Sequence, residues 1–192
     1  MSTSTSSSRK VPPLAESGVF ALQASIDIDA PREKVWKVLM DWGGYEEWNP
    51  FVRNQQLTDQ SRQPLPAQLQ MTPNEGQHLL ISPVHVPPTF SKPGLLQSQS
   101  AFEIITVLDH ENYRCAWENV EFPRWLMNAE RWQMLTEVEV DVDGARKKVT
   151  RYETIEVFGG ILAYFIVWFV GANLRKGFTA MAEGLKKRSE EL

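Results

Sequence analysis

The first hydrophobic pattern in the chain is an alternation that runs from Val19 to Ile28. The apolar residues of this segment share one face of an extended chain: Phe20, Leu22, Ala24, Ile26 and Ile28. The polar residues share the other face: Gln23, Ser25 and Asp27. A period of two residues is typical of a strand with one buried face, so a half-buried β-strand is predicted here.

A helical period follows this first strand. Pro31 is expected at the first position of a helix, where its missing N–H removes no hydrogen bond. The buried stripe of this helix consists of Val35, Trp36 and Leu39. The pair Gly43-Gly44 ends the helix, and residues 45–48 are predicted to form a second short helical turn that stops at Asn49-Pro50.

Strand patterns occupy the middle of the chain, separated by turns that contain proline or glycine. The predicted strands are Val52–Thr58, Ala67–Met71, Gln77–Ser82, Ala101–Leu108, Tyr113–Asn119, Ala129–Val140 and Ala145–Phe158. The segment Pro83–Pro93 is expected to be an ordered, extended loop, because proline cannot donate to a sheet ladder. In the last hairpin, Glu137 is expected to pair with Lys148 and Glu139 with Arg146 across the strands.

Gly159-Gly160 ends the last strand, and the chain from there to Leu192 is predicted to form one long helix. Its apolar stripe has helical spacing: Ala163, Val167, Val170, Leu174, Phe178, Met181 and Leu185. The run from Val157 to Leu174 has no charged residue and approaches the length of a membrane span. Because its first residues finish a strand and two glycines follow, a membrane span is not the preferred interpretation.

Two sequence segments make this order of elements more specific. Residues 24–52, ASIDIDAPREKVWKVLMDWGGYEEWNPFV, and residues 151–162, RYETIEVFGGIL, followed by RKGFTAMAEGLKKRSEE, resemble the START/Bet v 1-like (SRPBCC) superfamily. The similarity is greatest to its polyketide cyclase/dehydrase and lipid-transport branch, and it extends over residues 18–190. The resemblance implies an α+β helix-grip fold, in which a curved antiparallel sheet of about seven strands surrounds a long C-terminal helix.

The same resemblance implies two short helices after the first strand and a deep apolar cavity between sheet and helix. Residues 18–192 would form this single ligand-binding domain, after a flexible tail formed by residues 1–17. The superfamily contains carriers, sensors, cyclases and hydrolases, so it implies no single chemistry. Where relatives often carry a histidine after a Gly-Glu pair, this chain has Ala129-Glu130-Arg131.

Composition and charge exclude some classes of partner. Hydrophobic residues make up 42% and charged residues 23%, which is a globular composition. Lys and Arg number 20 against 24 Asp and Glu, and this acidic balance argues against nucleic-acid binding. The single cysteine, Cys115, rules out an intramolecular disulfide. A single cysteine fits a reducing compartment, and the Ser/Thr-rich N-terminus lacks the apolar stretch of a secretory signal. Both features favour a cytoplasmic location.

The candidate chemistry lies on the last hairpin. Polar residues interrupt two strands that face the cavity in this fold: Glu130, Arg131, Arg151, Tyr152 and Glu153. A buried charge needs a partner, so Arg131 and Glu153 are predicted as a catalytic Arg–Glu pair. Pairing of these residues across the strands on the solvent side is the alternative, and the strand register is left open.

Further residues are expected to contact a ligand: His85, Trp117, Trp132, Tyr152, Tyr164 and Val167. The three histidines, His78, His85 and His110, have no metal-ligand spacing, so neither a metal site nor a cofactor is expected. Cys115 lies among apolar neighbours in a strand, which is more typical of a packed thiol than of a nucleophile.

Three functions agree with these residues. The preferred one is a carrier or binding protein for an apolar molecule such as a lipid, a quinone or a polyketide-like compound. The second is a cofactor-independent cyclase/dehydratase or isomerase that acts on such a compound. The third is a membrane-docking or dimerising module. An enzyme needs a positioned acid and base, whereas a carrier does not.

The third function rests on the last predicted helix. About 18 residues make five turns of an α-helix, so residues that far apart share a face. In one continuous helix, aromatic residues would share faces with charged ones: Phe165 with Glu183, Trp168 with Lys186 and Phe169 with Lys187. The aromatic patch would need a cover, either a membrane, a second subunit or the proline-rich loop. Arg175 and Lys176, which follow directly, would suit anionic headgroups at a peripheral membrane contact.

Overall fold

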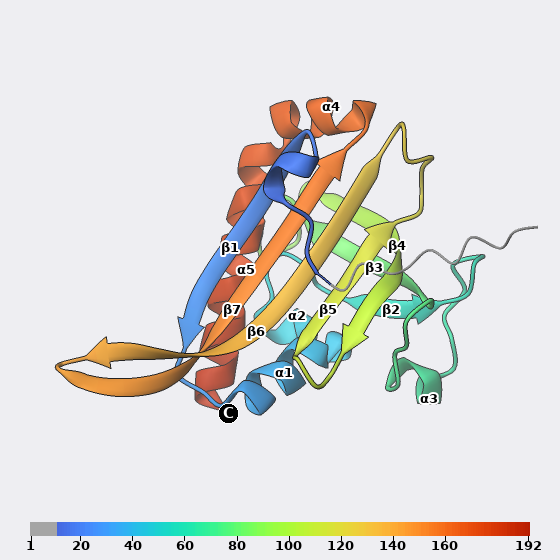
Figure 1. Cartoon of the computed structure of the whole chain (residues 1–192). Coiled ribbons are helices and arrows are strands. Elements are labelled where there is room, and N and C mark those ends of the chain that lie inside the picture. The colour runs from blue at the N-terminus through green and yellow to red at the C-terminus, as the bar shows by residue number, and fades with distance from the viewer. Residues whose placement is uncertain (1–10) are drawn as a thin grey trace, which may run out of the picture.

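Seven antiparallel strands form one curved sheet, in the order β1-β7-β6-β5-β4-β3-β2 (Figure 1). Their bounds are Phe20–Ile28 for β1, Gln55–Thr58 for β2, His78–His85 for β3, Ser98–Asp109 for β4, Arg114–Asn119 for β5, Asn128–Val142 for β6 and Ala145–Gly159 for β7. Strands β2 to β7 follow one another as a meander, and β1 pairs along β7. The computed structural model describes residues 11–192, so most of the predicted flexible tail, residues 1–10, lies outside the described residues.

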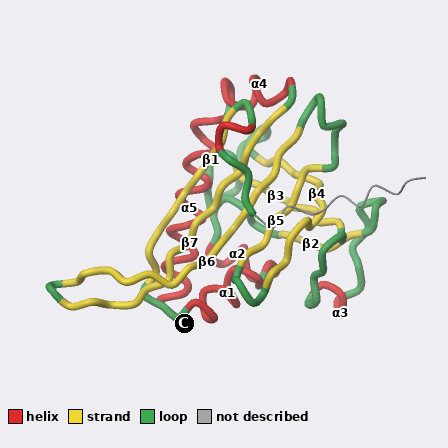
Figure 2. The backbone as a smooth tube through the Cα atoms, in the orientation of Figure 1, coloured by secondary structure: helices red, strands yellow, loops and turns green. Residues whose placement is uncertain are grey.

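The helices are Arg32–Met40 (α1), Tyr45–Trp48 (α2), Ala67–Gln70 (α3), Ile161–Phe169 (α4) and Gly171–Glu191 (α5), with single 3-10 turns at Ala15–Ser17 and Trp42–Gly44. Helices α1, α2 and α5 lie against one side of the sheet, and the short α3 lies beyond its β2 edge (Figure 2). Helix α5 runs along the sheet, α1 and α2 lie at one end, and α4 lies at the other (Figure 1). This arrangement confirms the helix-grip fold and the two short helices after β1.

The core lies between the sheet and α5. The first strand buries Leu22 and Ile28, in agreement with the predicted alternation. Three residues of α5 pack against the same core, Phe178, Met181 and Leu185. Burial of each such side chain contributes about 1.5–3 kcal/mol to folding. The inward face of the sheet is therefore fixed by apolar residues at alternate positions, and this parity decides which polar residues also point inward.

The structure corrects one predicted strand. Ala67–Gln70 forms the short helix α3, although Ala67–Met71 was predicted to be extended. The edge strand β2 does not use this segment as a partner strand. Instead, the side-chain amide of Gln70 donates to the carbonyl of Leu57 at 2.7 Å and accepts from its N–H at 2.8 Å. One glutamine side chain thus satisfies backbone groups that a neighbouring strand would otherwise pair with.

The loop in the proline-rich region begins and ends later in the chain than predicted. Strand β3 continues to His85, with a register shift between Ile81 and Val84. This irregularity accommodates Pro83, because proline is tolerated in a sheet where the ladder is interrupted. The loop between β3 and β4 therefore covers residues 86–97.

The predicted single long helix is broken at Val170, and α4 and α5 make an angle of 76°. Val170 has φ −128° and ψ −6°, which lies outside the helical range, and α5 begins at Gly171. Residues of α4 therefore do not share helical faces with residues five turns later in α5. Of the predicted apolar stripe, Ala163, Phe178, Met181 and Leu185 are buried, whereas Val167 and Val170 are exposed.

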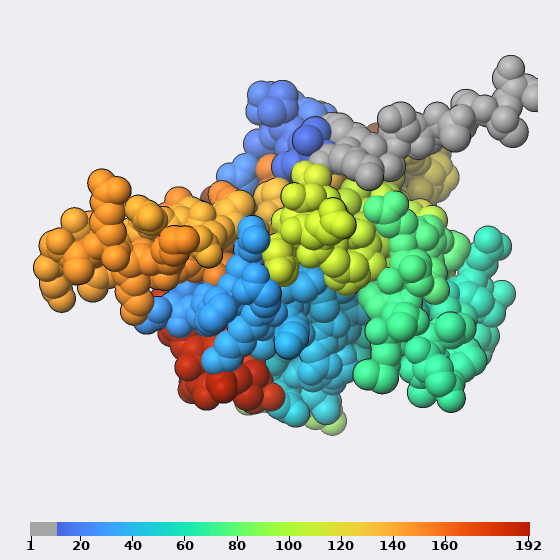
Figure 3. Space-filling model, turned by 60° about the horizontal axis from the view of Figure 1, so that its bottom comes forward, coloured from blue at the N-terminus to red at the C-terminus, as the bar shows by residue number. Residues whose placement is uncertain are grey.

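The tip of the β6–β7 hairpin extends beyond the body of the molecule (Figure 3). Both ion pairs predicted for it are present: Lys148 contacts Glu137 at 2.7 Å, and Arg146 contacts Glu139 at 3.4 Å. All four side chains are well exposed, so water screens both pairs and neither contributes much to stability.

Replacing Gly184 by alanine is expected to destabilise the domain by about 1–3 kcal/mol. A Cβ atom at this position of α5 would lie 2.4 Å from the carbonyl oxygen of Trp48, a backbone atom that cannot move alone. This clash exceeds the gain of about 1 kcal/mol that alanine brings to a helix interior. A Cβ atom at Gly43 would meet no atom within 4 Å, so Gly43→Ala is the matched control. Thermal unfolding of both variants measures the difference, and an unchanged or raised Tm for Gly184→Ala would contradict the close packing of α5 on α2.

Candidate functional site

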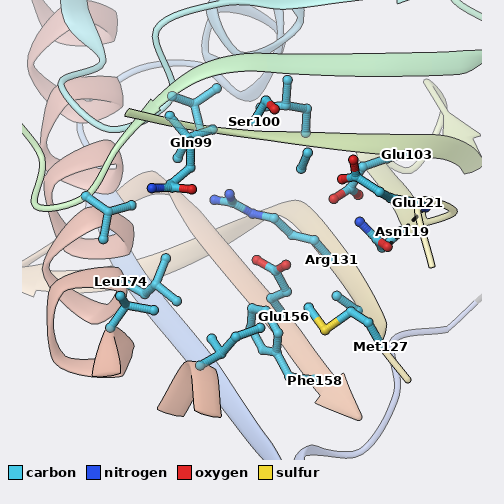
Figure 4. A pocket seen from close by; sticks show the side chains of 18 of the residues that line it. Gln99, Ser100, Glu103, Asn119, Glu121, Met127, Arg131, Glu156, Phe158 and Leu174 are labelled. Atoms are coloured by element: carbon cyan, nitrogen blue, oxygen red, sulfur yellow. Dashed lines mark hydrogen bonds between the residues drawn. The ribbon is translucent and has the colours of Figure 1, made fainter. Parts of the chain in front are cut away.

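A cavity of about 360 Å³ lies between the sheet and the junction of α4 with α5 (Figure 4). This volume lies within the range of small-molecule sites. Most of its wall is apolar: Phe51, Val52, Ile81, Val84, Val86, Leu96, Ala101, Trp117, Phe122, Met127, Ala129, Phe158, Ile166, Val170 and Leu174. The polar wall consists of Gln99, Ser100, Glu103, Asn119, Glu121, Arg131 and Glu156.

The register of the sheet positions the central polar residues. Arg131 of β6 lies directly opposite Glu156 of β7 and directly opposite Trp117 of β5. Residues opposite one another in an antiparallel sheet point to the same face, so all three side chains enter the cavity. Glu103 enters it from β4, where its cross-strand partner is Asn119. Figure 4 shows Glu103 and Glu156 on two sides of the extended Arg131 side chain.

Arg131 is only 5% exposed and is held by the core behind it. Its Nε donates to Oγ1 of Thr154 at 3.3 Å, and one terminal nitrogen donates to Sδ of Met181 at 3.2 Å. The guanidinium carbon lies 4.3 Å from the centre of the Phe178 ring, which is a cation–π contact. Thr154 in turn donates to the carbonyl of Trp132 at 2.9 Å, which fixes its orientation. These two hydrogen bonds use two of the five N–H donors of the guanidinium group, which also hydrogen-bonds the Tyr152 hydroxyl.

Burial changes the acidity of both carboxyl groups beside Arg131. Burial raises the pKa of Glu156 to about 7, although the Arg131 guanidinium opposes this change. Burial also raises the pKa of Glu103 well above its usual range, and the neighbouring Glu156 carboxylate raises it further. Burial therefore favours the protonated form of Glu103, and Glu156, with a pKa of about 7, is divided between its protonated and ionised forms at neutral pH. The cavity thus contains a proton donor, a proton acceptor and a fixed cation.

The raised pKa of Glu156 predicts that the free energy of unfolding falls as pH rises from about 5 to about 8. In the unfolded chain this carboxyl group ionises near its model value of 4.5, and in the folded protein near 7. Between these values the folded protein binds a proton that the unfolded chain does not, so the stabilisation is complete below the lower pKa and is lost as pH rises through the upper one. The difference amounts to at most about 3 kcal/mol.

Denaturant unfolding at the two pH values measures this loss. Glu156→Gln is expected to reduce the pH dependence, and Glu103 contributes the remainder with the same sign. Carboxyl groups with lowered pKa values, Asp27 and Asp109, change their charge below this pH window. Equal or greater stability of the wild type at the higher pH would contradict the assignment.

The structure brings Arg131 and Trp117 into the cavity but does not bring Glu153 or Trp132 there. Glu153 lies on the outer face of β7, because its position differs from that of Glu156 by an odd number of residues. Trp132 is buried on the same outer face, where its Nε1 donates to Glu130 at 2.7 Å. The predicted pair of Arg131 with Glu153 is therefore replaced by Arg131 with Glu156.

The other predicted ligand contacts lie outside the cavity wall. His85 is buried beside the loop, and its Nδ1 is 2.8 Å from the carbonyl oxygen of Thr89. Tyr152 is a core residue, and its hydroxyl donates to Oε1 of Gln133 at 2.6 Å. Tyr164 and Val167 are exposed on α4. In α4, the residue that lines the cavity is Ile166 instead.

Sequence reasoning missed Glu103 and Glu156, although a signal was present. Each is a single acid at a position whose neighbours two residues away include apolar, inward-facing side chains. Glu103 lies two residues after Ala101 and two residues before Ile105, and Glu156 lies two residues before Phe158. Counting positions back from the buried Phe158 would have placed Glu156 inside and Glu153 outside.

Other candidate chemistry is absent from the described residues or unsuited to catalysis. Burial raises the pKa of the Cys115 thiol to about 12, so it remains protonated at neutral pH. Residues 11–192 contain no group of three or more His, Cys, Asp or Glu side chains that could hold a metal ion. Within the same range, no single helix is long and apolar enough to cross a membrane; α4 and α5 reach that length and hydropathy only as a bent pair.

Residues 20–190 match the protein family described as polyketide cyclase/dehydrase and lipid transport. The chain belongs to this family. The match confirms the resemblance found in the sequence and includes every strand and helix that forms the cavity. Membership in the polyketide cyclase/dehydrase and lipid-transport family supports hydrophobic ligand binding or a cyclase role, without specifying a substrate.

Individual relatives agree with this assignment. Oxopyrrolidines biosynthesis cluster protein O from Penicillium oxalicum is 29% identical over 189 residues, which cover 93% of this chain and 90% of that protein. The Zhui aromatase/cyclase from Streptomyces sp. R1128 has a TM-score of 0.57 at 13% identity, covering 89% of this chain and 93% of that one. Norcoclaurine synthase from Thalictrum flavum has a TM-score of 0.54 at 12% identity, covering 89% and 94%. At such low identity, the two structural likenesses show a shared fold.

Proposed function

We propose that this protein is a cofactor-independent cyclase/dehydratase that acts on an apolar biosynthetic intermediate with carbonyl groups. The observation that carries the proposal is the cluster of Arg131, Glu103 and Glu156 in an otherwise apolar cavity. A carrier of hydrocarbon-like molecules needs no buried cation with an acid on either side, and burying such groups costs free energy. The biosynthetic-cluster relative supports the same choice, and the family description includes it.

The apolar wall would bind the carbon skeleton and exclude water. The free N–H donors of Arg131 would hold a carbonyl oxygen of the intermediate. A cavity of this size holds a flexible chain in a folded conformation, so two of its carbonyl groups are brought near each other. Binding alone would therefore favour ring closure over reactions between separate molecules.

The first chemical step is proton removal from a carbon next to the bound carbonyl. The Glu156 carboxylate takes this proton, and the electron pair of the C–H bond forms an enolate whose oxygen accepts hydrogen bonds from Arg131. The enolate carbon then forms a bond to a second carbonyl carbon of the same molecule. Glu103, as a carboxylic acid, gives its proton to the oxygen of that carbonyl, which becomes a hydroxyl group.

Dehydration returns both carboxyl groups to their starting states. The Glu103 carboxylate takes a second proton from the carbon next to the hydroxyl-bearing one, and Glu156 gives its proton to the hydroxyl group, which leaves as water. The electron pair of the broken C–H bond forms the new double bond. One water is released, and neither an oxidant nor a reductant is needed. These reaction steps therefore require no cofactor.

The test is native mass spectrometry of the protein purified from its own cells, followed by extraction of the bound compound. We expect an apolar compound with at least one carbonyl group, and we expect fresh protein to convert its open-chain form with loss of the mass of water. Saturable binding of that compound without any conversion would favour a carrier. Absence of saturable binding of any apolar compound would overturn both functions.

A further inference from the structure

Helix α4 presents one side to the cavity and a large aromatic surface to solvent. Ile166 lines the cavity and Ala163 is fully buried. The opposite side is exposed: Trp168 by 83%, Phe169 by 73%, Tyr164 by 64%, Phe165 by 56% and Ile161 by 53%. Soluble monomers seldom expose several large apolar side chains together, so this surface is expected to have a partner.

The loop between β5 and β6 extends the same surface. The N–H of Ile161 donates to the carbonyl of Trp125 at 3.2 Å, and the N–H of Leu162 donates to the carbonyl of Leu126 at 2.9 Å. These bonds fix the loop against the start of α4. The side chains of Trp125 and Phe122 are exposed beside α4, and Phe122 also lines the cavity. We call α4 together with residues 120–126 the aromatic end of the domain.

The mouth of the cavity opens at this end. Leu96 of the β3–β4 loop lines the cavity and is also exposed, so the wall reaches solvent there. Its neighbour Leu95 is exposed as well. Three chain segments therefore surround the opening with apolar side chains: the β3–β4 loop, the β5–β6 loop and α4.

Cations outnumber acids around the aromatic end, whose one acid, Glu121, pairs with Arg62 at 2.9 Å. Arg175 and Lys176 are exposed one turn into α5, and neither forms an ion pair with another residue between 11 and 192. Arg124 is exposed beside Trp125, although it also contacts Glu118 at 2.6 Å. The segment from Val157 to Leu174 contains no acidic residue. This basic edge is local, because the whole chain has a formal charge of −4.

We propose that the aromatic end docks on the surface of an anionic phospholipid bilayer, with the mouth of the cavity facing the lipid. Exposed Trp and Tyr rings are suited to the level of the headgroups, and a short helix lying in that plane buries its apolar side in the acyl boundary. The basic side chains complement anionic headgroups. A compound that dissolves in the bilayer then enters the cavity without crossing water.

A second copy of the chain fits this surface less well. A two-fold contact places the same patch of both subunits face to face. The cations beside α4 would then be present from both copies, and the acid at this end, Glu121, is already paired with Arg62. An anionic lipid surface neutralises the same cations, so the charge pattern favours the bilayer.

Flotation with lipid vesicles tests the proposal. The wild type is expected to float with vesicles of phosphatidylcholine mixed with phosphatidylserine, and to float less with phosphatidylcholine alone or at high salt. In the double variant Trp168→Ser, Phe169→Ser, the fraction of protein bound to vesicles is expected to fall by about tenfold or more. Arg175→Glu, Lys176→Glu is expected to lose binding to the mixed vesicles while keeping its fold.

Leu69→Ser, Met71→Ser provides the matched control, because these exposed apolar residues lie at α3, at the opposite end of the molecule from α4 (Figure 1). It should float as the wild type does, and circular dichroism should show that all variants are folded. The proposal is overturned if the wild type stays with the unbound fraction at low salt. It is also overturned if light scattering without lipid shows a dimer that Trp168→Ser, Phe169→Ser converts to a monomer, because the surface is then a subunit contact.

Discussion

Replacing Glu156 by glutamine is expected to lower turnover of the cavity compound by about 10²–10⁴-fold, with little change in its affinity. Glutamine has nearly the same size and can still form hydrogen bonds, but it cannot accept the proton from the substrate carbon. The pKa of about 7 makes Glu156 the group best matched to proton transfer at neutral pH. Single-turnover rates and binding constants, measured on the same compound, separate the loss of chemistry from a loss of binding.

Glu153→Gln is the matched control for this variant. The two glutamates belong to the same strand, but Glu153 lies on the outer face of the sheet, next to Arg151. We expect Glu153→Gln to keep the wild-type rate. An equal loss of activity in both variants would indicate an effect of the strand as a whole, and full activity of Glu156→Gln would remove this residue from the mechanism.

Replacing Arg131 by methionine is expected to lower turnover by about 10²–10³-fold and also to weaken binding of anionic or carbonyl compounds. The methionine side chain keeps contact with Phe178 and Met181 but supplies no donor for the enolate oxygen. The apolar dye ANS offers a simple readout, because its ring system suits the cavity wall and its sulfonate would pair with the guanidinium. We expect its Kd to rise about tenfold or more in this variant.

Arg151→Met controls for the removal of one arginine from the sheet. Arg151 pairs with Asp27 at 2.7 Å on the outer face, and both side chains are more than a third exposed. This replacement should change both ANS binding and stability very little, because the pair is screened by water. Unchanged ANS binding in Arg131→Met would mean that the dye, and therefore the polar end of a ligand, does not reach the guanidinium.

The regular elements could be predicted where the pattern was local and repeated. The alternation in β1 and the apolar stripe of α1 each extend over several residues, and both elements form nearly as predicted. The short segment Ala67–Gln70 offered no such repetition, and its structure depends on the contact of Gln70 with Leu57. The break at Val170 was missed because an uncharged apolar run looks alike whether it continues straight or bends.

The candidate site was only partly predictable because it depends on the register of the strands. Arg131 could be proposed from its unusual place in a strand. Choosing between Glu153 and Glu156 required knowing which face of β7 is buried, and a shift of one residue exchanges the two. Glu103 comes from β4, and β5 separates β4 from β6, so no local pattern associates this residue with Arg131. Contacts across several strands come from the folded sheet, not from neighbouring positions in the sequence.

The exchange of hydrogen for deuterium next to a carbonyl group measures proton transfer by the cavity carboxyl groups. β-Tetralone, an apolar bicyclic ketone with acidic protons beside its carbonyl, is incubated with the protein in D₂O and followed by NMR. Ala101→Trp places a large side chain in the cavity and serves as the blocked form. We predict rapid exchange with the wild type and exchange at the buffer rate with Ala101→Trp and with Glu156→Gln. Exchange at the buffer rate with the wild type, or equally rapid exchange with all three proteins, would contradict acid–base chemistry in this cavity.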